Sequence, residues 1–405
     1  MRFSSLLLPL ALAATVACTG CKTKKKVPID APPPPPVDAD ISTGAGPGPR
    51  QLEKLGEPFT AEADGSAGEP GLAADRDGKA VLAFVEKGKV HVRRWSGTAW
   101  DALGAPPNDA THRASGKPSV ASEESGALVV AWQEMNKDDI NVLQLARWKD
   151  NAWAALPALG SGKAGVMDPV VESSPVGLVA VWRETEAPSK DAVHVARFDE
   201  AAAAWQPMGE GGLLRAVAEG TTRRAPALST SKAGVLAGWI EVAPSSTLQL
   251  RRWDAAASKW TEVPAPEGVD DNSTLAIAHS PDGTITVAMS YVMGMRQVVQ
   301  LLPGATEWIK IDVPEIANGY APGQRLVAAE DGRIIFTYPF AGRFGWWDGK
   351  AWTATPVGVM APSEVTPVAA TGPGGVVYVA WSQGPATGPT RVRVLEVKKK
   401  ALGEK

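Results

Sequence analysis

The sequence predicts an all-β protein, a seven-bladed β-propeller of four-stranded antiparallel blades. Residues 117–156 contain four short apolar runs separated by turn residues, which is the pattern of four antiparallel strands. The end of the second run recurs along the chain, with an aromatic residue in most copies at Phe84, Trp132, Trp182, Trp239, Met289, Tyr338 and Trp381. Copies lie 43 to 57 residues apart. A four-strand repeat of that length is typical of propeller blades.

The predicted blades follow one another without a break in the repeat. They span Glu69–Leu103, Lys117–Leu156, Asp168–Met208, Ala225–Val263, Ser273–Ile311, Gln324–Thr355 and Pro367–Val397. Five blades carry a proline near the start of the first strand: Pro70, Pro118, Pro169, Pro226 and Pro367. We expect each proline at the first strand position, where a missing N–H is tolerated.

The seventh repeat ends without a fourth strand, and the N-terminal side of the propeller supplies a candidate. Gly56 precedes Pro70 by fourteen residues, as Gly104 precedes Pro118. Leu52–Gly56 therefore has the register of a last strand. We predict that it pairs with the strand at 390–397, because this pairing closes the ring and removes two open edges.

The N-terminus predicts a lipid-anchored envelope protein. Residues 1–17 have the charge, apolar segment and small residues of a secretory signal peptide. Cys18 is the expected lipidation site, and Cys21 is the alternative; an ordinary cleaved signal peptide or a disulfide between them is the simpler interpretation. Residues 18–50, rich in Lys, Pro and Gly, predict a disordered tether. Neither Thr19 nor Lys22, the residue after each candidate cysteine, is an aspartate. By resemblance to the sorting signals of well-studied lipoproteins, this implies an outer-membrane lipoprotein facing the periplasm or the cell surface.

The propeller is assigned to residues 51–397 and a basic tail to 398–405. The composition of the chain excludes several classes of function. The net charge is −3, so nothing indicates a nucleic-acid partner. The only two cysteines precede the propeller, and the four histidines are scattered, so the sequence predicts neither a metal site nor a cofactor.

The fifteen tryptophans recur with the repeat, apart from Trp346. They end second strands (Trp132, Trp182, Trp239, Trp381), end third strands (Trp95, Trp148, Trp253, Trp347) and occupy fourth strands (Trp100, Trp153, Trp205, Trp260, Trp308, Trp352). Aromatic faces stack on sugars, but a residue repeated in every blade is better explained as packing between sheets. We therefore predict a structural role.

Two charged positions also recur in the first four blades. Acids follow the second-strand aromatic at Glu86, Glu134, Glu184 and Glu241, and Arg precedes the end of the third strand at Arg94, Arg147, Arg197 and Arg252. The simpler interpretation is a cross-strand ion pair in each blade. The alternative is a ligand-binding pocket in every blade, and this residue set resembles the Arg–Glu–Trp pockets of fucose-binding propeller lectins.

A further alternative is hydrolytic. Ser280-Pro281-Asp282-Gly283-Thr284 resembles the start of the Asp-box turn of sialidase-like propellers. The resemblance implies a degenerate sialidase-like glycoside hydrolase. The expected aromatic is absent, because Ile285 follows, and no two catalytic acids can be assigned.

Repeats of the form G-x-x-V-V-A-W-x-E … R-W-x-G-x-x-W resemble those of uncharacterised secreted lipoproteins of myxobacteria, and distantly those of sialidase- and kelch-like propellers. The resemblance covers Glu69 to about Val397 and implies a propeller. The leading hypothesis is a non-enzymatic envelope lipoprotein that serves as a protein-binding or assembly scaffold. A lectin-like carbohydrate-binding propeller and a degenerate hydrolase are the alternatives.

Overall fold

The computed structural model describes residues 50–399, except 107–112, 137, 163, 188–189, 210–221, 243–244, 270–272, 291–295, 312–324, 339–342, 357–366 and 385–388. The predicted signal peptide, Cys18, Cys21, nearly all of the tether and the end of the basic tail lie outside the described residues. No helix within the described part of the chain is long and apolar enough to cross a membrane.

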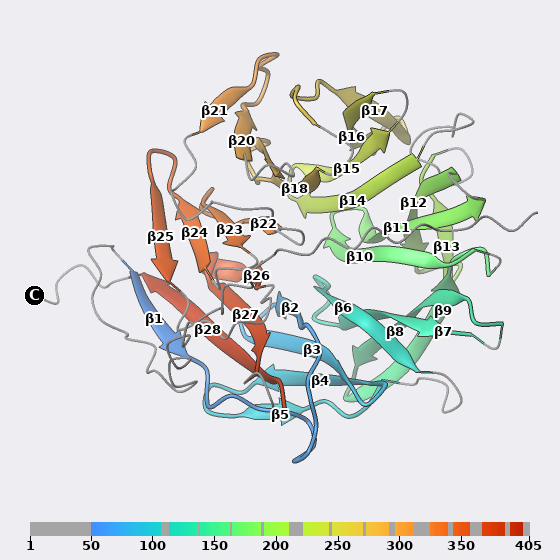
Figure 1. Ribbon diagram of the computed structural model, residues 1–405, viewed down its shortest axis with the longest axis vertical. Helices are drawn as coiled ribbons and strands as arrows, with labels where there is room; N and C mark the ends of the chain where they lie inside the picture. Colours follow the sequence, from blue (N-terminus) through green and yellow to red (C-terminus); the bar gives the residue numbers. More distant parts are fainter. Residues whose placement is uncertain are drawn as a thin grey trace, which may run out of the picture. The chain divides into compact units, whose positions relative to one another are not determined.

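Seven four-stranded antiparallel sheets form a ring, which confirms the predicted seven-bladed β-propeller (Figure 1). Blades one and two contain β2 (Gly71–Ala74), β3 (Ala80–Glu86), β4 (Lys89–Trp95), β5 (Trp100–Ala102), and β6 (Ala114–Ser122), β7 (Leu128–Met135), β8 (Asn141–Lys149), β9 (Ala152–Leu159). Blades three and four contain β10 (Val166–Ser174), β11 (Gly177–Ala187), β12 (Lys190–Asp199), β13 (Ala204–Pro207), and β14 (Thr222–Ser231), β15 (Gly234–Val242), β16 (Ser246–Asp254), β17 (Lys259–Val263).

The remaining blades have the same strand order. Blade five contains β18 (Thr274–His279), β19 (Ile285–Ser290), β20 (Arg296–Leu301) and β21 (Ile309–Ile311). Blade six contains β22 (Arg325–Ala328), β23 (Ile334–Tyr338), β24 (Arg343–Trp347) and β25 (Trp352–Pro356). Blade seven contains β26 (Val368–Thr371), β27 (Val377–Gln383), β28 (Arg391–Lys399) and the N-terminal β1 (Arg50–Lys54).

The ring closes as predicted, with strands from both ends of the described chain in one sheet. β1 is the outer strand of blade seven and pairs antiparallel with β28, with Leu52 opposite Val397 (Figure 1). β28 extends two residues beyond the predicted end of the propeller, so Lys398 and Lys399 belong to the strand. The closing strand leaves the last blade with four strands, like the other six.

The core of the propeller is divided among the junctions between blades. Seven apolar clusters occur among the described residues, and each joins two consecutive blades. Second strands such as β3 are almost continuously apolar and buried, because sheets cover both of their faces. The second-strand tryptophans Trp132, Trp182, Trp239 and Trp381 are at most 6% exposed, which confirms the predicted packing role.

In the first six blades, tryptophans of the third and fourth strands join the blade to the preceding one. The two strands place aromatic rings opposite each other, for example Trp148 and Trp153 with ring centroids 5.3 Å apart. In blades one to five, the indole N–H of the fourth-strand tryptophan then donates to a backbone carbonyl that precedes the blade. These bonds are Trp100 to Leu55 (2.7 Å), Trp153 to Leu103 (2.8 Å), Trp205 to Pro157 (2.8 Å), Trp260 to Met208 (2.9 Å) and Trp308 to Pro264 (3.0 Å).

The prediction that the prolines begin their strands is wrong in three blades. β6, β10 and β14 begin three or four residues earlier, and Pro118, Pro169 and Pro226 lie within them. The register shifts at each of these positions, so that extra residues face the second-strand tryptophan. A bulge breaks the ladder where proline has no N–H to donate, which makes the longer strand possible.

A charged cluster in the central channel

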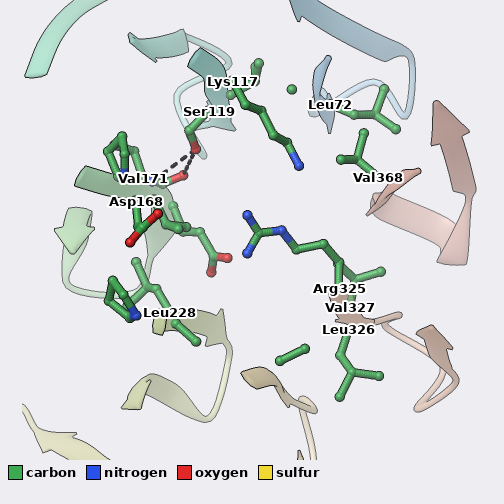
Figure 2. Close-up of a pocket in the computed structure, with 18 of the residues that line it drawn as sticks. Leu72, Lys117, Ser119, Asp168, Val171, Leu228, Arg325, Leu326, Val327 and Val368 are labelled. Carbon is green, nitrogen blue, oxygen red and sulfur yellow. Dashed lines mark hydrogen bonds between the residues drawn. The ribbon is translucent and has the colours of Figure 1, made fainter. Parts of the chain in front are cut away.

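The channel on the axis of the ring holds a cavity of about 510 Å³ (Figure 2). The innermost strand of each blade contributes to its lining. Most of the lining is apolar or small, but five residues are ionisable: Glu69, Lys117, Asp168, Glu172 and Arg325. Its volume falls in the range of about 300–1,000 Å³ that is usual for small-molecule sites.

Strand bulges place two of the charged side chains. Ser115 faces Gln133 and Ser119 faces Ala131, so residues 116–118 all lie opposite one residue of β7. In β10 the shift falls between Met167 and Val170. A bulge re-aims the side chains at its site. Lys117 and Asp168 lie in these bulges and line the channel.

Arg325 occupies a position that is small or aliphatic in every other blade. Each residue of this set lies opposite the residue that precedes the second-strand aromatic or its equivalent. The members are Gly71, Ser119, Val170, Ala227, Ala276, Arg325 and Val368. The long side chain of Arg325 therefore extends from blade six into space that its counterparts leave open (Figure 2).

Glu172 is another departure from the repeat. The position holds Ala73 in blade one, Ala121 in blade two and Ser229 in blade four. One carboxylate oxygen accepts the backbone N–H of Thr230 at 2.7 Å, which ties blade three to blade four. Burial raises the pKa of Glu172 to about 7, although the bonds to Thr230 and the charge of Arg325 act in the opposite direction.

The channel cations affect each other. Burial is the main cause that lowers the pKa of Lys117 well below its usual range, and the charge of Arg325 lowers it further, while Glu69 opposes both. Burial also lowers the pKa of Arg325, against the charges of Asp168, Glu69 and Glu172. The five residues therefore form one electrostatic cluster. Among the described residues, no group of His, Cys, Asp or Glu has the arrangement of a metal site.

The repeated acids lie elsewhere, in the blade junctions. Glu86, Glu134 and Glu184 are at most 2% exposed, and Glu241 is half-buried. The carboxylate of Glu86 accepts the backbone N–H groups of Ala61 (2.8 Å) and Glu62 (3.0 Å). The carboxylate of Glu184 accepts the N–H of Ser161 at 3.1 Å and the indole N–H of Trp182 at 2.7 Å. These two acids hold the loop that precedes their blade.

The predicted cross-strand pair of Glu and Arg is wrong, and so is a pocket formed by both within one blade. The register places Glu86 opposite Lys89, whereas Arg94 faces Val81, five residues further along β3. The same separation occurs between Glu134 and Arg147, Glu184 and Arg197, and Glu241 and Arg252. Five residues of strand span about 16 Å, so the two side chains lie at opposite ends of the blade.

The arginines use acids at their own end of the blade. Arg94 binds Asp75 at 2.5 Å and Asp77 at 2.9 Å, in the turn that follows the first strand. Arg147 binds Glu123 of the equivalent turn at 2.8 Å and Glu200 of blade three. Arg197 and Arg252 are exposed. The first two arginines therefore stabilise turns.

The fold and channel define the class of this protein as a seven-bladed propeller with a charged axial cavity. No protein-family profile and no curated protein matches the chain. Among solved structures, the polysaccharide lyase Uly1 matches with a TM-score of 0.57 and 10% identity, over 85% of this chain and 91% of that one. This likeness shows the fold alone.

Two other solved structures match over most of the chain. A protein of unknown function from Dyadobacter fermentans DSM 18053 has 11% identity and a TM-score of 0.47, over 86% of this chain and 99% of that one. A chain of the Mitotic Checkpoint Complex has 12% identity and a TM-score of 0.48, over 90% and 96%. The resemblance to myxobacterial lipoproteins stays a prediction.

Proposed function

We propose that this protein is a non-enzymatic envelope lipoprotein, anchored through Cys18, whose propeller is a scaffold that binds a ligand in the central channel. One observation carries the proposal. Glu172 and Arg325 stand where the other blades have small or aliphatic residues, and they share the channel with Lys117, Asp168 and Glu69. Charge in a partly buried channel costs free energy, so a stable fold alone gives no reason for it.

The repeated Glu and Arg residues already bind other parts of the fold, which supports a ligand site in the channel and not in the individual blades. Glu86 and Glu184 bind loop backbone, and Arg94 and Arg147 bind the acids of turns. The lectin-like alternative, with one Arg–Glu–Trp pocket in each blade, has no geometric basis in the observed register. Carbohydrate binding within the channel remains an alternative ligand class for the same site.

The hydrolytic alternative would use the channel carboxylates. Glu69, Asp168 and Glu172 line the cavity, and a glycoside hydrolase needs one acid and one base or nucleophile. A binding protein and a hydrolase differ in whether a bound glycan is cleaved. The test of the proposed function therefore includes an assay for new reducing ends.

The experiment is a binding screen of the full-length lipoprotein in detergent micelles on arrays of short peptides and oligosaccharides. Ala369→Trp places a large side chain in the channel, because Ala369 lines the cavity. Ala202→Trp, at an exposed turn of blade three, is the matched control. We expect ligands that are bound by the wild type and by Ala202→Trp and lost in Ala369→Trp.

Two outcomes contradict the proposal. Ligands that bind Ala369→Trp as well as the wild type would place the site outside the channel. New reducing ends from a bound glycan, abolished in Ala369→Trp, would make the protein an enzyme. Mass spectrometry of the mature N-terminus tests the anchor: a diacylglyceryl group on Cys18 is expected, and its absence would remove the lipoprotein part of the proposal.

A further inference from the structure

Two cationic side chains enter the channel from separate blades. Lys117 comes from β6 in blade two and Arg325 from β22 in blade six, and Figure 2 shows both charged ends directed into the cavity. Neither forms a hydrogen bond or a salt bridge with another residue in the described part of the chain. Like charges that share a low-dielectric cavity repel, and an anion between them relieves the repulsion.

None of the three channel carboxylates forms a salt bridge with either cation in the described part of the chain. The carboxylate of Glu172 accepts the N–H of Thr230, and burial raises its pKa to about 7, so it is protonated in part of the molecules at neutral pH. Glu69 and Asp168 are exposed. Their negative charges disfavour a polyanion, so we expect a ligand with a single anionic group.

We propose that Lys117 and Arg325 bind one carboxylate of a small ligand that enters the channel. The inference rests on the proposed function and names the chemistry of its ligand. The guanidinium of Arg325 offers a planar fork that matches a carboxylate, and the ammonium of Lys117 adds a compact charge. Ser119, which also lines the cavity, donates its hydroxyl to the carbonyl of Val171 in blade three at 3.2 Å and accepts the N–H of Val171 at 3.1 Å.

The carboxylate can come from a sugar acid or from an amino acid, and the probes separate these sources. Isothermal titration of the full-length protein in micelles uses glucuronate and N-acetylalanine, with glucose and N-acetylalanine amide as neutral counterparts. We expect at least one acid to bind about tenfold or more tightly than its neutral counterpart, as a charge-assisted hydrogen bond requires.

Matched variants locate the site. Lys117→Met and Arg325→Gln are each expected to weaken binding of the acid by about tenfold or more. Arg252→Gln and Lys259→Met remove exposed cations of blade four outside the cavity and are expected to leave the affinity unchanged. Equal binding of acid and neutral probes, or unchanged affinity in both channel variants, would overturn the proposal, as would the absence of binding at millimolar concentrations.

Proton uptake on ligand binding distinguishes a binding role of Lys117 from a structural one. An anion beside Lys117 stabilises its charged form, against the burial and the Arg325 charge that lower the pKa; Glu69, Asp168 and Glu172 are the other charges in the cavity. Because a bound anion would also raise the pKa of Glu172, the comparison is made in the Glu172→Gln variant. Titrations over a series of pH values in two buffers of different ionisation enthalpy should show more proton uptake in Glu172→Gln than in the Glu172→Gln/Lys117→Met double variant. Equal uptake in the two variants would contradict the assigned role.

The two proposals fail in different ways. A ligand that Ala369→Trp excludes, but that binds Lys117→Met and Arg325→Gln as it binds the wild type, would keep the channel site and overturn the carboxylate assignment. An acid that binds Ala369→Trp normally would overturn both, because neither the ligand nor its anion would then occupy the cavity.

Discussion

The carboxyl group of Glu172 makes the stability of the propeller depend on pH. Its carboxyl pKa rises from the ordinary 4.5 to about 7, chiefly because of burial. The folded protein then keeps a proton that the unfolded chain has lost, so this group lowers the free energy of unfolding as pH rises from about 4.5 to 7. Glu172 is half-buried, so solvent screening reduces the effect.

We expect Glu172→Gln to remove this pH dependence. The amide still offers an oxygen to the N–H of Thr230 and carries no charge. Relative to the wild type, the variant should gain about 1–3 kcal/mol at pH 8 and almost nothing at pH 4.5. Urea unfolding at both pH values measures the difference. The half-buried His91 and the buried His279, whose pKa values burial lowers, are common to both proteins and cancel. If the free energies of unfolding of the variant and the wild type differed by the same amount at both pH values, the assignment of the pH dependence to Glu172 would be wrong.

The fourth strand of each blade shows how an element can carry an inter-blade bond. The indole N–H of Trp153 in β9 donates to the carbonyl of Leu103 at 2.8 Å. In β25, Trp352 packs on Trp347 in the same register, but its indole nitrogen has no hydrogen bond among the described residues. The two positions therefore differ by one hydrogen bond.

We expect Trp153→Phe to lower the free energy of unfolding by about 1–3 kcal/mol more than Trp352→Phe does, because only the first leaves a carbonyl without its donor. Both variants keep an aromatic ring in the cross-strand pair. Thermal unfolding followed by circular dichroism measures the difference. Equal losses in the two variants would show that packing, and not the indole bond, explains why tryptophan recurs in the fourth strand.

Elements that repeat could be predicted from the sequence, and residues that depart from the repeat could not. The strands around Trp132 and the closing strand after Arg50 follow from local apolar patterns with a fixed spacing. The Glu–Arg pairing failed because antiparallel strands place the ends of consecutive strands at opposite rims of a blade, as the register of Glu86 and Arg94 shows.

The channel residues were missed for a physical reason. Lys117 and Arg325 come from separate blades and meet only after the ring closes. A charged residue beside the proline of a first strand, such as Lys117 or Asp168, was a signal that sequence reasoning could have used. Arg325 has no such marker, because its blade lacks the proline.

At the scale of the whole molecule, one junction joins residues from the two ends of the propeller. Leu55 is 3% exposed in the apolar cluster between blades seven and one. Its N–H donates to the carbonyl of Val394 at 3.0 Å, and its carbonyl accepts the indole N–H of Trp100 at 2.7 Å. The other junctions join blades that the chain connects directly, whereas this one depends on the closing segment.

Leu55→Ala should weaken the closure by about 2–4 kcal/mol, the usual cost of truncating a buried leucine. We expect amides of β5 and β28 to exchange hydrogen faster in this variant, while those of β15 in blade four keep their protection, because repeats interact mainly with their neighbours. Leu103→Ala, at the junction of blades one and two, is the control and should leave β28 unchanged. Equal acceleration in all seven blades would show instead that the ring opens only as a single unit, with every junction contributing alike.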